Sequence, residues 1–247
     1  MLTGKNAIIT GCAKGIGKET LTLFAENGAN IWACIRKPTE EFSNYIIELQ
    51  NKYGVNIIPI YFDFANENEI KEAVKEIRKS KQNVDILVNN AGITYNALFQ
   101  MTTMEKLKEV FDINFFKQFL FTQYVVKMMV RQKSGSIINI SSSAAIDGNS
   151  GRSAYGASKA AVICTTKAMA EELAEYNIRV NAIAPGITHT DMVAASMTDQ
   201  VIEETVQQTK LGRIGKPSEI ASGCLYLASH LSSYVTGQVL RIDGGLK

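Results

Sequence analysis

The sequence predicts an α/β fold with a doubly wound, seven-stranded parallel sheet and helices on both faces. Two observations indicate this fold. Short runs rich in Ile, Val and Ala recur along the chain without polar–apolar alternation, which is typical of strands buried on both faces. Most of these runs are separated by segments with helical periodicity, and strands that alternate with helices form βαβ units with parallel strands.

The seven expected strands are short apolar runs. They cover residues 6–10, 30–35, 56–62, 85–90, 136–141, 179–184 and 238–243. The segment after the first strand places Leu21, Phe24 and Ala25 on one helical face and stops at an Asn-Gly pair, residues 27–28, which typically ends a helix. The segment 66–80 repeats its apolar residues at helical spacing, so we expect a second amphipathic helix there.

The chain shows no internal boundary. No linker, low-complexity tract or repeat divides it, and 247 residues are an ordinary length for one α/β domain. With 46% hydrophobic and 20% charged residues it can bury a sizeable core. We therefore expect a single domain over residues 1–247. Within it, the polar, Met-containing segment at about residues 188–212 is expected to act as a substrate lid.

Composition and spacing argue against several classes of function. A net charge of +2, from 26 basic and 24 acidic residues, does not suit a nucleic-acid-binding surface. The four cysteines lie far apart without a CxxC pair, as free thiols of a cytoplasmic protein do. Two histidines, His189 and His230, are too few for a His-based metal centre, and we expect His189 to face solvent. We also expect neither a signal peptide nor a membrane span.

The segment 103–132 reads as one long helix with apolar residues on most of its circumference. These residues are Val110, Phe111, Ile113, Phe115, Phe116, Phe119, Leu120 and Phe121. A helix with this pattern is covered on two sides. One side is expected to face the sheet, and the other to face a second subunit or a loop of the same chain.

The first strand runs directly into a glycine loop. Gly11, Gly15 and Gly17 lie between this strand and the first helix. Glycines at such a place let the backbone turn tightly and approach a pyrophosphate at the helix N-terminus, as in a Rossmann-type fold. A tight turn without a ligand is the alternative.

The end of the second strand bears on the choice of dinucleotide. An acidic residue there would bind the ribose of NAD, whereas an arginine suits the 2′-phosphate of NADP. Here Ile35 stands at the acidic position, Arg36 and Lys37 follow, and Lys14 extends from the glycine loop. The sequence therefore predicts NADP(H), with solvated surface charge as the alternative reading of these cations.

Several motifs occur in one order along the chain. They are TGCAKGIG (10–17), NNAG (89–92), Asn114, Ser142, YGASK (155–159) and PGITHT (185–190). In this combination the chain resembles a short-chain dehydrogenase/reductase over essentially its whole length. Within that family it is most similar to the 3-oxoacyl-(acyl-carrier-protein) reductases, to which its TDM, GRIGKPSEIA and YVTGQVLRIDGG segments also correspond.

The resemblance implies a catalytic set of Asn114, Ser142, Tyr155 and Lys159. Ser142 and Tyr155 would bind the substrate carbonyl, Lys159 the nicotinamide ribose, and Asn114 would hold Lys159 through water. Ser142 has hydroxyl neighbours on both sides, and the family spacing of thirteen residues before Tyr155 selects it. For Asn114, a purely structural hydrogen bond is the alternative.

The resemblance also implies the residues that hold the cofactor. They are Gly11, Lys14, Gly15, Ile16, Gly17, Arg36, Asp63, Phe64, Asn90, Ala91, Gly92, Tyr155, Lys159, Pro185, Gly186, Thr188 and Thr190. Asp63 resembles the residue that reads the adenine amino group, and its alternative role is the N-cap of the helix that starts near Asn66.

The implied reaction is reversible hydride transfer between NADPH and a ketone or 3-oxo thioester. Tyr155 would act as general acid, although a phenol titrates near about pH 10. Lys159, one helical turn away, is expected to lower that pKa through its positive charge.

Other functions stay open at the level of sequence. A reductase of a free sugar, polyol or hydroxy-ketone shares the same motifs, and a non-catalytic dinucleotide-binding sensor is a remote third reading.

Docking of an acidic carrier protein needs basic residues, for which Arg131 and Lys133 are available. The family's docking arginine would fall near Tyr176, where this chain has none, and Arg179 is the expected substitute. We expect a homotetramer or a homodimer.

Overall fold

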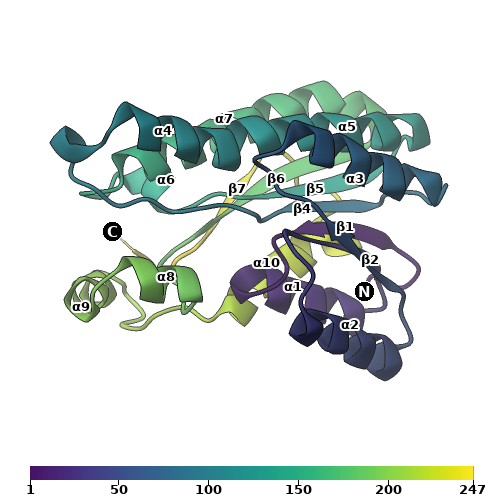
Figure 1. The fold of residues 1–247 in the computed structure, drawn as a ribbon, viewed down its shortest axis with the longest axis horizontal. Coiled ribbons are helices and arrows are strands. Elements are labelled where there is room, and N and C mark those ends of the chain that lie inside the picture. The colour runs from purple at the N-terminus through teal and green to yellow at the C-terminus, as the bar shows by residue number, and fades with distance from the viewer. Residues whose placement is uncertain (247) are drawn as a thin grey trace.

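A seven-stranded parallel sheet forms the centre of the molecule (Figure 1), in the order β3-β2-β1-β4-β5-β6-β7. The computed structural model describes residues 1–246. The strands are β1 (Asn6–Thr10), β2 (Asn30–Ile35), β3 (Ile57–Tyr61), β4 (Ile86–Asn89), β5 (Gly135–Ile140), β6 (Ile178–Pro185) and β7 (Val239–Ile242). Each strand lies within one residue of its expected bounds, so the predicted fold class is confirmed.

Helices cover both faces of the sheet (Figure 1). One face carries α1 (Gly15–Glu26), α2 (Glu40–Tyr53) and α10 (Pro217–Ala228), and the other carries α3 (Glu67–Lys79), α4 (Met104–Phe111), α5 (Lys117–Gln132) and α7 (Ser153–Leu173). Three shorter helices, α6 (Ala144–Asp147), α8 (Asp191–Ser196) and α9 (Asp199–Gln207), stand at the carboxyl ends of the strands. No helix in the described part of the chain is long and apolar enough to cross a bilayer.

The predicted helix boundaries have local causes in the structure. In α1 the predicted apolar face is fully buried. This helix ends where the side chain of Asn27 donates to the Leu23 carbonyl oxygen at 2.8 Å. The helix expected after the third strand begins at Asn66, whose side-chain oxygen accepts from the backbone amides of Asn68 and Glu69.

Two apolar clusters, one on each face, hold the sheet between the helical layers. The cluster under α1 and α10 includes Leu21, Phe24 and Ile220, and the opposite cluster includes Phe62 and Phe121. Because both faces of the sheet are packed, side chains reach a ligand only at the strand ends. The chain reverses its direction of winding between β1 and β4, and ligands of open parallel sheets bind outside the carboxyl ends at such a point.

The long helix expected over residues 103–132 differs from its prediction in one respect. It consists of α4, a π-helical turn over Asp112–Phe116, and α5. π-helical turns are rare and often occur at functional sites, and this one contains Asn114. On the outer side of this helix, Phe116 and Phe119 are 55% and 42% exposed, so the alternative of a covering loop from residues 1–246 is wrong.

Candidate active site

A cleft of about 490 Å³ opens at the carboxyl ends of the strands, between the sheet and the α8–α9 segment. Strand ends supply one wall, α7 a second and the α8–α9 segment a third. The cleft brings together many of the residues that the sequence singles out. These are Ile16, Asn90, Gly92, Ser142, Tyr155, Lys159, Pro185, Gly186, Thr188 and Thr190.

The glycine loop packs against the residues that follow β4. Gly11 has a φ of +69°, and a Cβ atom on it would lie 2.9 Å from the Ala91 Cα atom. A Cβ atom on Gly17 would lie 2.3 Å from the Gly11 carbonyl oxygen and 2.5 Å from the Asn90 Nδ2 atom. A side chain fits at neither position, so the backbone approaches a ligand as closely as the expected cradle requires.

The N-terminus of α1 opens beside this loop. Its N-cap residue is Lys14, which makes no capping hydrogen bond, and the first turn contains no acidic side chain. Backbone N–H groups at such a terminus carry partial positive charge and bind phosphate. The loop and the helix together fit the pyrophosphate of a dinucleotide.

Thr10 is a structural residue that the sequence reasoning missed. Its buried hydroxyl accepts from the backbone amides of Asn90 and Ala91, both at 3.0 Å, and donates to the Val88 carbonyl oxygen at 3.3 Å. The Asn90 side chain donates in turn to the carbonyl oxygens of Thr10 and Gly11. The threonine directly before the first glycine is the only signal that could have indicated this role.

Asn114 joins the strand-β4 segment to α7. Its Oδ1 atom accepts from the Ile93 amide at 2.8 Å, while its Nδ2 atom donates to the Ile93 carbonyl oxygen at 2.9 Å and to the Ser158 hydroxyl at 3.1 Å. A Cβ atom on Gly92 would lie 3.0 Å from Asn114 Oδ1 and 3.4 Å from Lys159 Nζ. The Asn114 amide and the Lys159 amine therefore both lie next to Gly92.

Lys159 is nearly completely buried, with 4% of its surface exposed. Its Nζ atom donates to the Ile140 carbonyl oxygen at 2.9 Å. Burial disfavours the charged amine and lowers the pKa of Lys159 to about 8. Lys159 is therefore held at the end of β5 by a backbone carbonyl, a contact that the YGASK spacing does not reveal.

The pKa of Tyr155 shifts in the opposite direction to the one expected from the sequence. Burial of its hydroxyl raises the pKa of the phenol, and the nearby Ser142 hydroxyl and the Arg152 charge oppose that rise. The expected lowering by Lys159 is wrong for this structure, because desolvation dominates and the amine is directed to Ile140.

Two of the three consecutive serines after β5, Ser141 and Ser142, are distinguished by their contacts. The Ser141 hydroxyl donates to the Lys159 carbonyl oxygen at 2.9 Å and so anchors α7. The Ser142 hydroxyl lines the cleft near Tyr155 and accepts from the Ala144 amide at 3.2 Å. These contacts favour Ser142 over Ser141 as the group that meets a substrate.

Three predicted cofactor residues lie at the ends of β2 and β3, outside the cleft. Arg36 is exposed and forms no ion pair with any residue of 1–246. Asp63 accepts from the Ala65 amide at 2.9 Å, and Asn66 rather than Asp63 caps α3, so the alternative capping role of Asp63 is wrong. Phe64 packs its ring in the core, which leaves only its backbone for a ligand.

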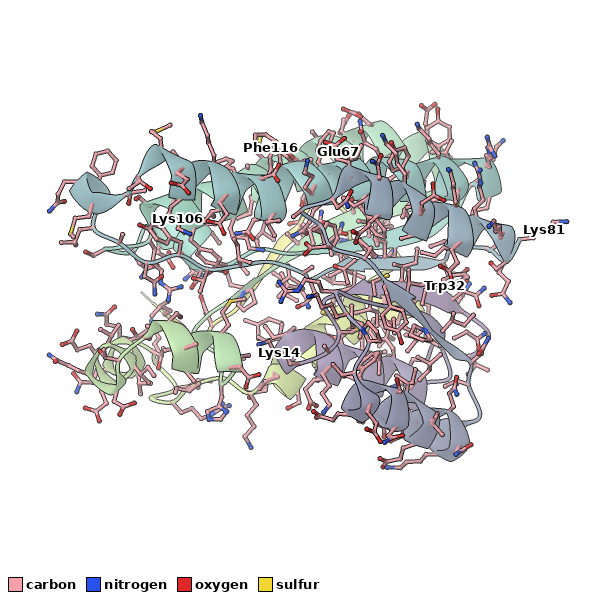
Figure 2. The ribbon with its side chains drawn as sticks, in the orientation of Figure 1. Lys14, Trp32, Glu67, Lys81, Lys106 and Phe116 are labelled. Carbon is pink, nitrogen blue, oxygen red and sulfur yellow. The ribbon has the colours of Figure 1, made fainter. Side chains whose placement is uncertain are left out.

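Polar contacts join the segment around α8 and α9 to other parts of the cleft. Lys14 lies between α1 and α8 in Figure 2, and its Nζ atom is 3.7 Å from an Asp191 carboxylate oxygen. On the other side of the segment, Asn96 donates to the Ser196 carbonyl oxygen at 2.6 Å. Sequence reasoning missed the apolar lining that this segment supplies, which includes Met192 and Met197.

Thr94 is another lining residue that the sequence reasoning missed. Its hydroxyl oxygen is buried and has no hydrogen-bond partner within residues 1–246. A buried hydroxyl without a partner costs about 1–3 kcal/mol. A polar group of a bound ligand would supply the missing partner, so Thr94 supports a ligand site in this cleft.

Comparison with known proteins agrees with the geometry. A sequence model of the family described as enoyl-(acyl carrier protein) reductase matches residues 11–247. The chain belongs to the short-chain dehydrogenase/reductase family, whose members are oxidoreductases of hydroxyl and carbonyl groups.

Its relatives cover nearly the whole chain. A 3-oxoacyl-(acyl-carrier-protein) reductase of Thermotoga maritima is 44% identical over 246 residues, which are 99% of this chain and 98% of the relative. A solved putative NAD(P)-dependent gluconate 5-dehydrogenase from Beutenbergia cavernae, with bound NADP, has a TM-score of 0.92 at 32% identity and covers 99% and 97% of the two chains. A 7α-hydroxysteroid dehydrogenase solved with NADH and 7-oxo glycochenodeoxycholic acid has a TM-score of 0.91 at 34% identity, with 99% and 95% covered.

Proposed function

We propose that the chain is an NADPH-dependent carbonyl reductase that converts a 3-oxoacyl-(acyl-carrier-protein), or a related 3-oxo thioester, to its 3-hydroxy product. One observation carries the proposal: Ser142, Tyr155 and Lys159 line a single cleft that continues to the glycine loop, with Asn114 directly behind Lys159. The activity named for the Thermotoga maritima relative supports the choice of substrate.

The residues present fit NADP(H). The glycine cradle and the uncapped start of α1 would hold the pyrophosphate, and Arg36 would hold the 2′-phosphate. Lys159 would bind the nicotinamide ribose, while residues around Thr188 would hold the carboxamide. When bound, NADPH supplies the hydride for the substrate carbonyl carbon.

The protein itself supplies the proton and the electrostatic stabilisation. Ser142 and Tyr155 donate hydrogen bonds to the carbonyl oxygen, where negative charge develops in the transition state. Because burial raises the pKa of the phenol, Tyr155 holds its proton at neutral pH until the oxygen becomes basic enough to take it. The nearby Arg152 guanidinium then stabilises the phenolate that remains.

A second candidate is the reduction of a free sugar, polyol or other hydroxy-ketone. The observation that favours it concerns Arg179, the expected substitute for a docking arginine. Its guanidinium is half-buried and donates to the carbonyl oxygens of Leu227 and Val235 and to the Ser136 hydroxyl. Arg179 is therefore a structural residue, and the expectation that it docks a carrier protein is wrong.

A substrate panel tests the two candidates. We would follow oxidation of NADPH and NADH with an acetoacetyl thioester, sugar ketones, diketones and a steroid ketone. The proposal predicts the highest kcat/KM for the thioester with NADPH. A higher kcat/KM for a free ketone would favour the second candidate. If no compound caused oxidation of NADPH or NADH, the result would favour a non-catalytic dinucleotide-binding sensor.

We further propose a cytoplasmic homotetramer or homodimer with one domain over residues 1–247. The four cysteines are free thiols, which suits a reducing compartment. The exposed Phe116 and Phe119 rings suit a second subunit. The segment at about residues 188–212 would serve as the lid, because it forms one wall of the cleft.

A further inference from the structure

Arg152 stands at the start of α7, one helical turn before Tyr155. It lines the cleft, and its guanidinium carbon lies 5.6 Å from the centroid of the Tyr155 ring. Within residues 1–246 the guanidinium forms no ion pair and no hydrogen bond, although it is partly buried. A cation in this position lies beside any carbonyl that Tyr155 holds.

The other charged groups of the cleft have partners. Both carboxylate oxygens of Asp147 accept from Arg241, at 2.7 and 2.8 Å. The Lys159 amine donates to a backbone carbonyl. On α9, the Glu204 carboxylate accepts from the Gln200 side chain at 3.0 Å. Arg152 is thus the cation of the cleft that lacks an acceptor among the described residues.

Guanidinium chemistry indicates which ligand fits. Arginine presents a planar fork of N–H donors that matches a carboxylate with two parallel hydrogen bonds. We propose that Arg152 binds the carboxylate of a second substrate class, oxo acids whose carboxylate lies a few bonds from the carbonyl held by Ser142 and Tyr155, and that the cleft favours these acids over their uncharged esters. This inference rests on the proposed carbonyl reduction, and it names an anionic substrate class for the same cleft.

Two alternatives to a substrate carboxylate, a 3-oxo thioester and Glu204, predict a different substrate dependence. A 3-oxo thioester carries no full charge near its carbonyl and would gain little from a guanidinium. Glu204 on the proposed lid is the second candidate, since it also lines the cleft. An ion pair between Arg152 and Glu204 would affect neutral and anionic substrates equally.

The test compares acetoacetate with its methyl ester, which share the reacting carbonyl and differ in charge. For each protein the readout is the ratio of the two kcat/KM values with NADPH. We expect Arg152→Gln to lower the acid-to-ester ratio at least about tenfold, because a charge-assisted pair is lost. Arg152→Lys, which keeps the charge but not the fork, should give an intermediate ratio. Arg78→Gln, the same charge change on the exposed side of α3 outside the cleft, is the matched control.

A binding measurement separates this inference from the proposed reaction. Calorimetric titration of 3-hydroxybutyrate and of its methyl ester onto the NADPH-loaded protein involves no turnover, since ligand and cofactor are both reduced. We expect Arg152→Gln to weaken binding of the acid at least about tenfold relative to the ester. Equal ratios in wild type and Arg152→Gln, in kinetics or in binding, would overturn the role of Arg152. Binding that follows the prediction without any ketone reduction would overturn only the proposed reaction.

Discussion

Tyr155 and Lys159 lie on one helix, but their surroundings constrain them differently. Lys159 is enclosed and donates to Ile140, whereas Tyr155 faces the cleft beside Ser142 and Arg152. Burial lowers the pKa of the amine and raises that of the phenol, so each group shifts towards its neutral form. At neutral pH this arrangement keeps the proton on Tyr155, as a reductase requires.

The buried amine predicts a pH-dependent stability. Because the pKa of Lys159 falls from 10.5 to about 8 on folding, the unfolded chain binds more protons between these pH values. The free energy of unfolding contributed by this residue therefore rises as the pH increases from about 8 towards 10.5. Urea titrations across this range should show the rise in wild type and lose it in Lys159→Met. The exposed residue Lys167 on the same helix gives the control Lys167→Met, and an identical pH profile for all three proteins would contradict the account.

For single residues, the sequence predicts which residues form the site better than it predicts their contacts. The order of the motifs predicted Asn114, Ser142, Tyr155 and Lys159, and the structure brings all four to one cleft or directly behind it. The motif order did not reveal Arg152, because an arginine at a helix start usually faces solvent. Its role follows only from its place over the Tyr155 ring and from the partners of the neighbouring charges.

The glycine loop is the element that fits the structure to a dinucleotide. Its glycines let the loop lie against Asn90 and Ala91 and leave the start of α1 open. This geometry depends on close backbone approach, so it is sensitive to a single methyl group.

Gly17→Ala should weaken NADPH binding about tenfold or more. The added Cβ atom meets the Gly11 carbonyl oxygen at 2.3 Å, and relieving such an overlap costs about 1–3 kcal/mol. Calorimetric titration of NADPH would measure the change. Gly54→Ala is the control for backbone strain, because Gly54 has a left-handed backbone conformation and open space around it. This variant should retain its NADPH affinity. Unchanged affinity in Gly17→Ala would refute the cradle.

We expect Arg36, at the end of β2, to set the preference for NADP over NAD. Arg36→Asp should lower the ratio of kcat/KM for NADPH over NADH at least about tenfold, since a charge-assisted contact with the 2′-phosphate is replaced by repulsion. Arg78→Asp, on the exposed side of α3, makes the same charge change away from the site. If the ratio stays the same in Arg36→Asp, the assignment of Arg36 is wrong.

Strands and helices were predictable where the apolar pattern is itself the cause of the structure. Residues 30–35, for example, are buried on both faces of the sheet. Their sequence lacks polar–apolar alternation for that reason, so the pattern alone predicts a buried strand. The π-helical turn at Asp112–Phe116 was not predictable, because its residues continue the apolar pattern of an ordinary helix. What distinguishes it is the pairing of Asn114 with Ile93, a contact between segments about 20 residues apart.

At the scale of the whole molecule, the layer formed by α4 and α5 presents aromatic rings to solvent. Figure 2 shows Phe116 on the outer side of this layer, and Phe119 follows it one turn later. Clustered exposed aromatic side chains of this kind mark interaction surfaces. We infer that a second subunit covers them.

Phe119→Glu should dissociate the proposed oligomer, because a carboxylate buried against apolar side chains is costly. Size-exclusion chromatography with light scattering at low micromolar concentration should give a dimer or tetramer for wild type and a smaller species for the variant. Ile47→Glu, at an exposed apolar residue of α2, is the control. A monomeric wild type would contradict the expectation.

The central claim is that the cleft reduces a carbonyl with Tyr155 as the acid. The most direct measurement is the rate of NADPH oxidation by wild type and Tyr155→Phe with an acetoacetyl thioester, alongside the NADPH dissociation constant of each protein. The account predicts turnover by wild type and a loss of at least about 100-fold in kcat for Tyr155→Phe, which still binds NADPH. Equal turnover by the two proteins would contradict it.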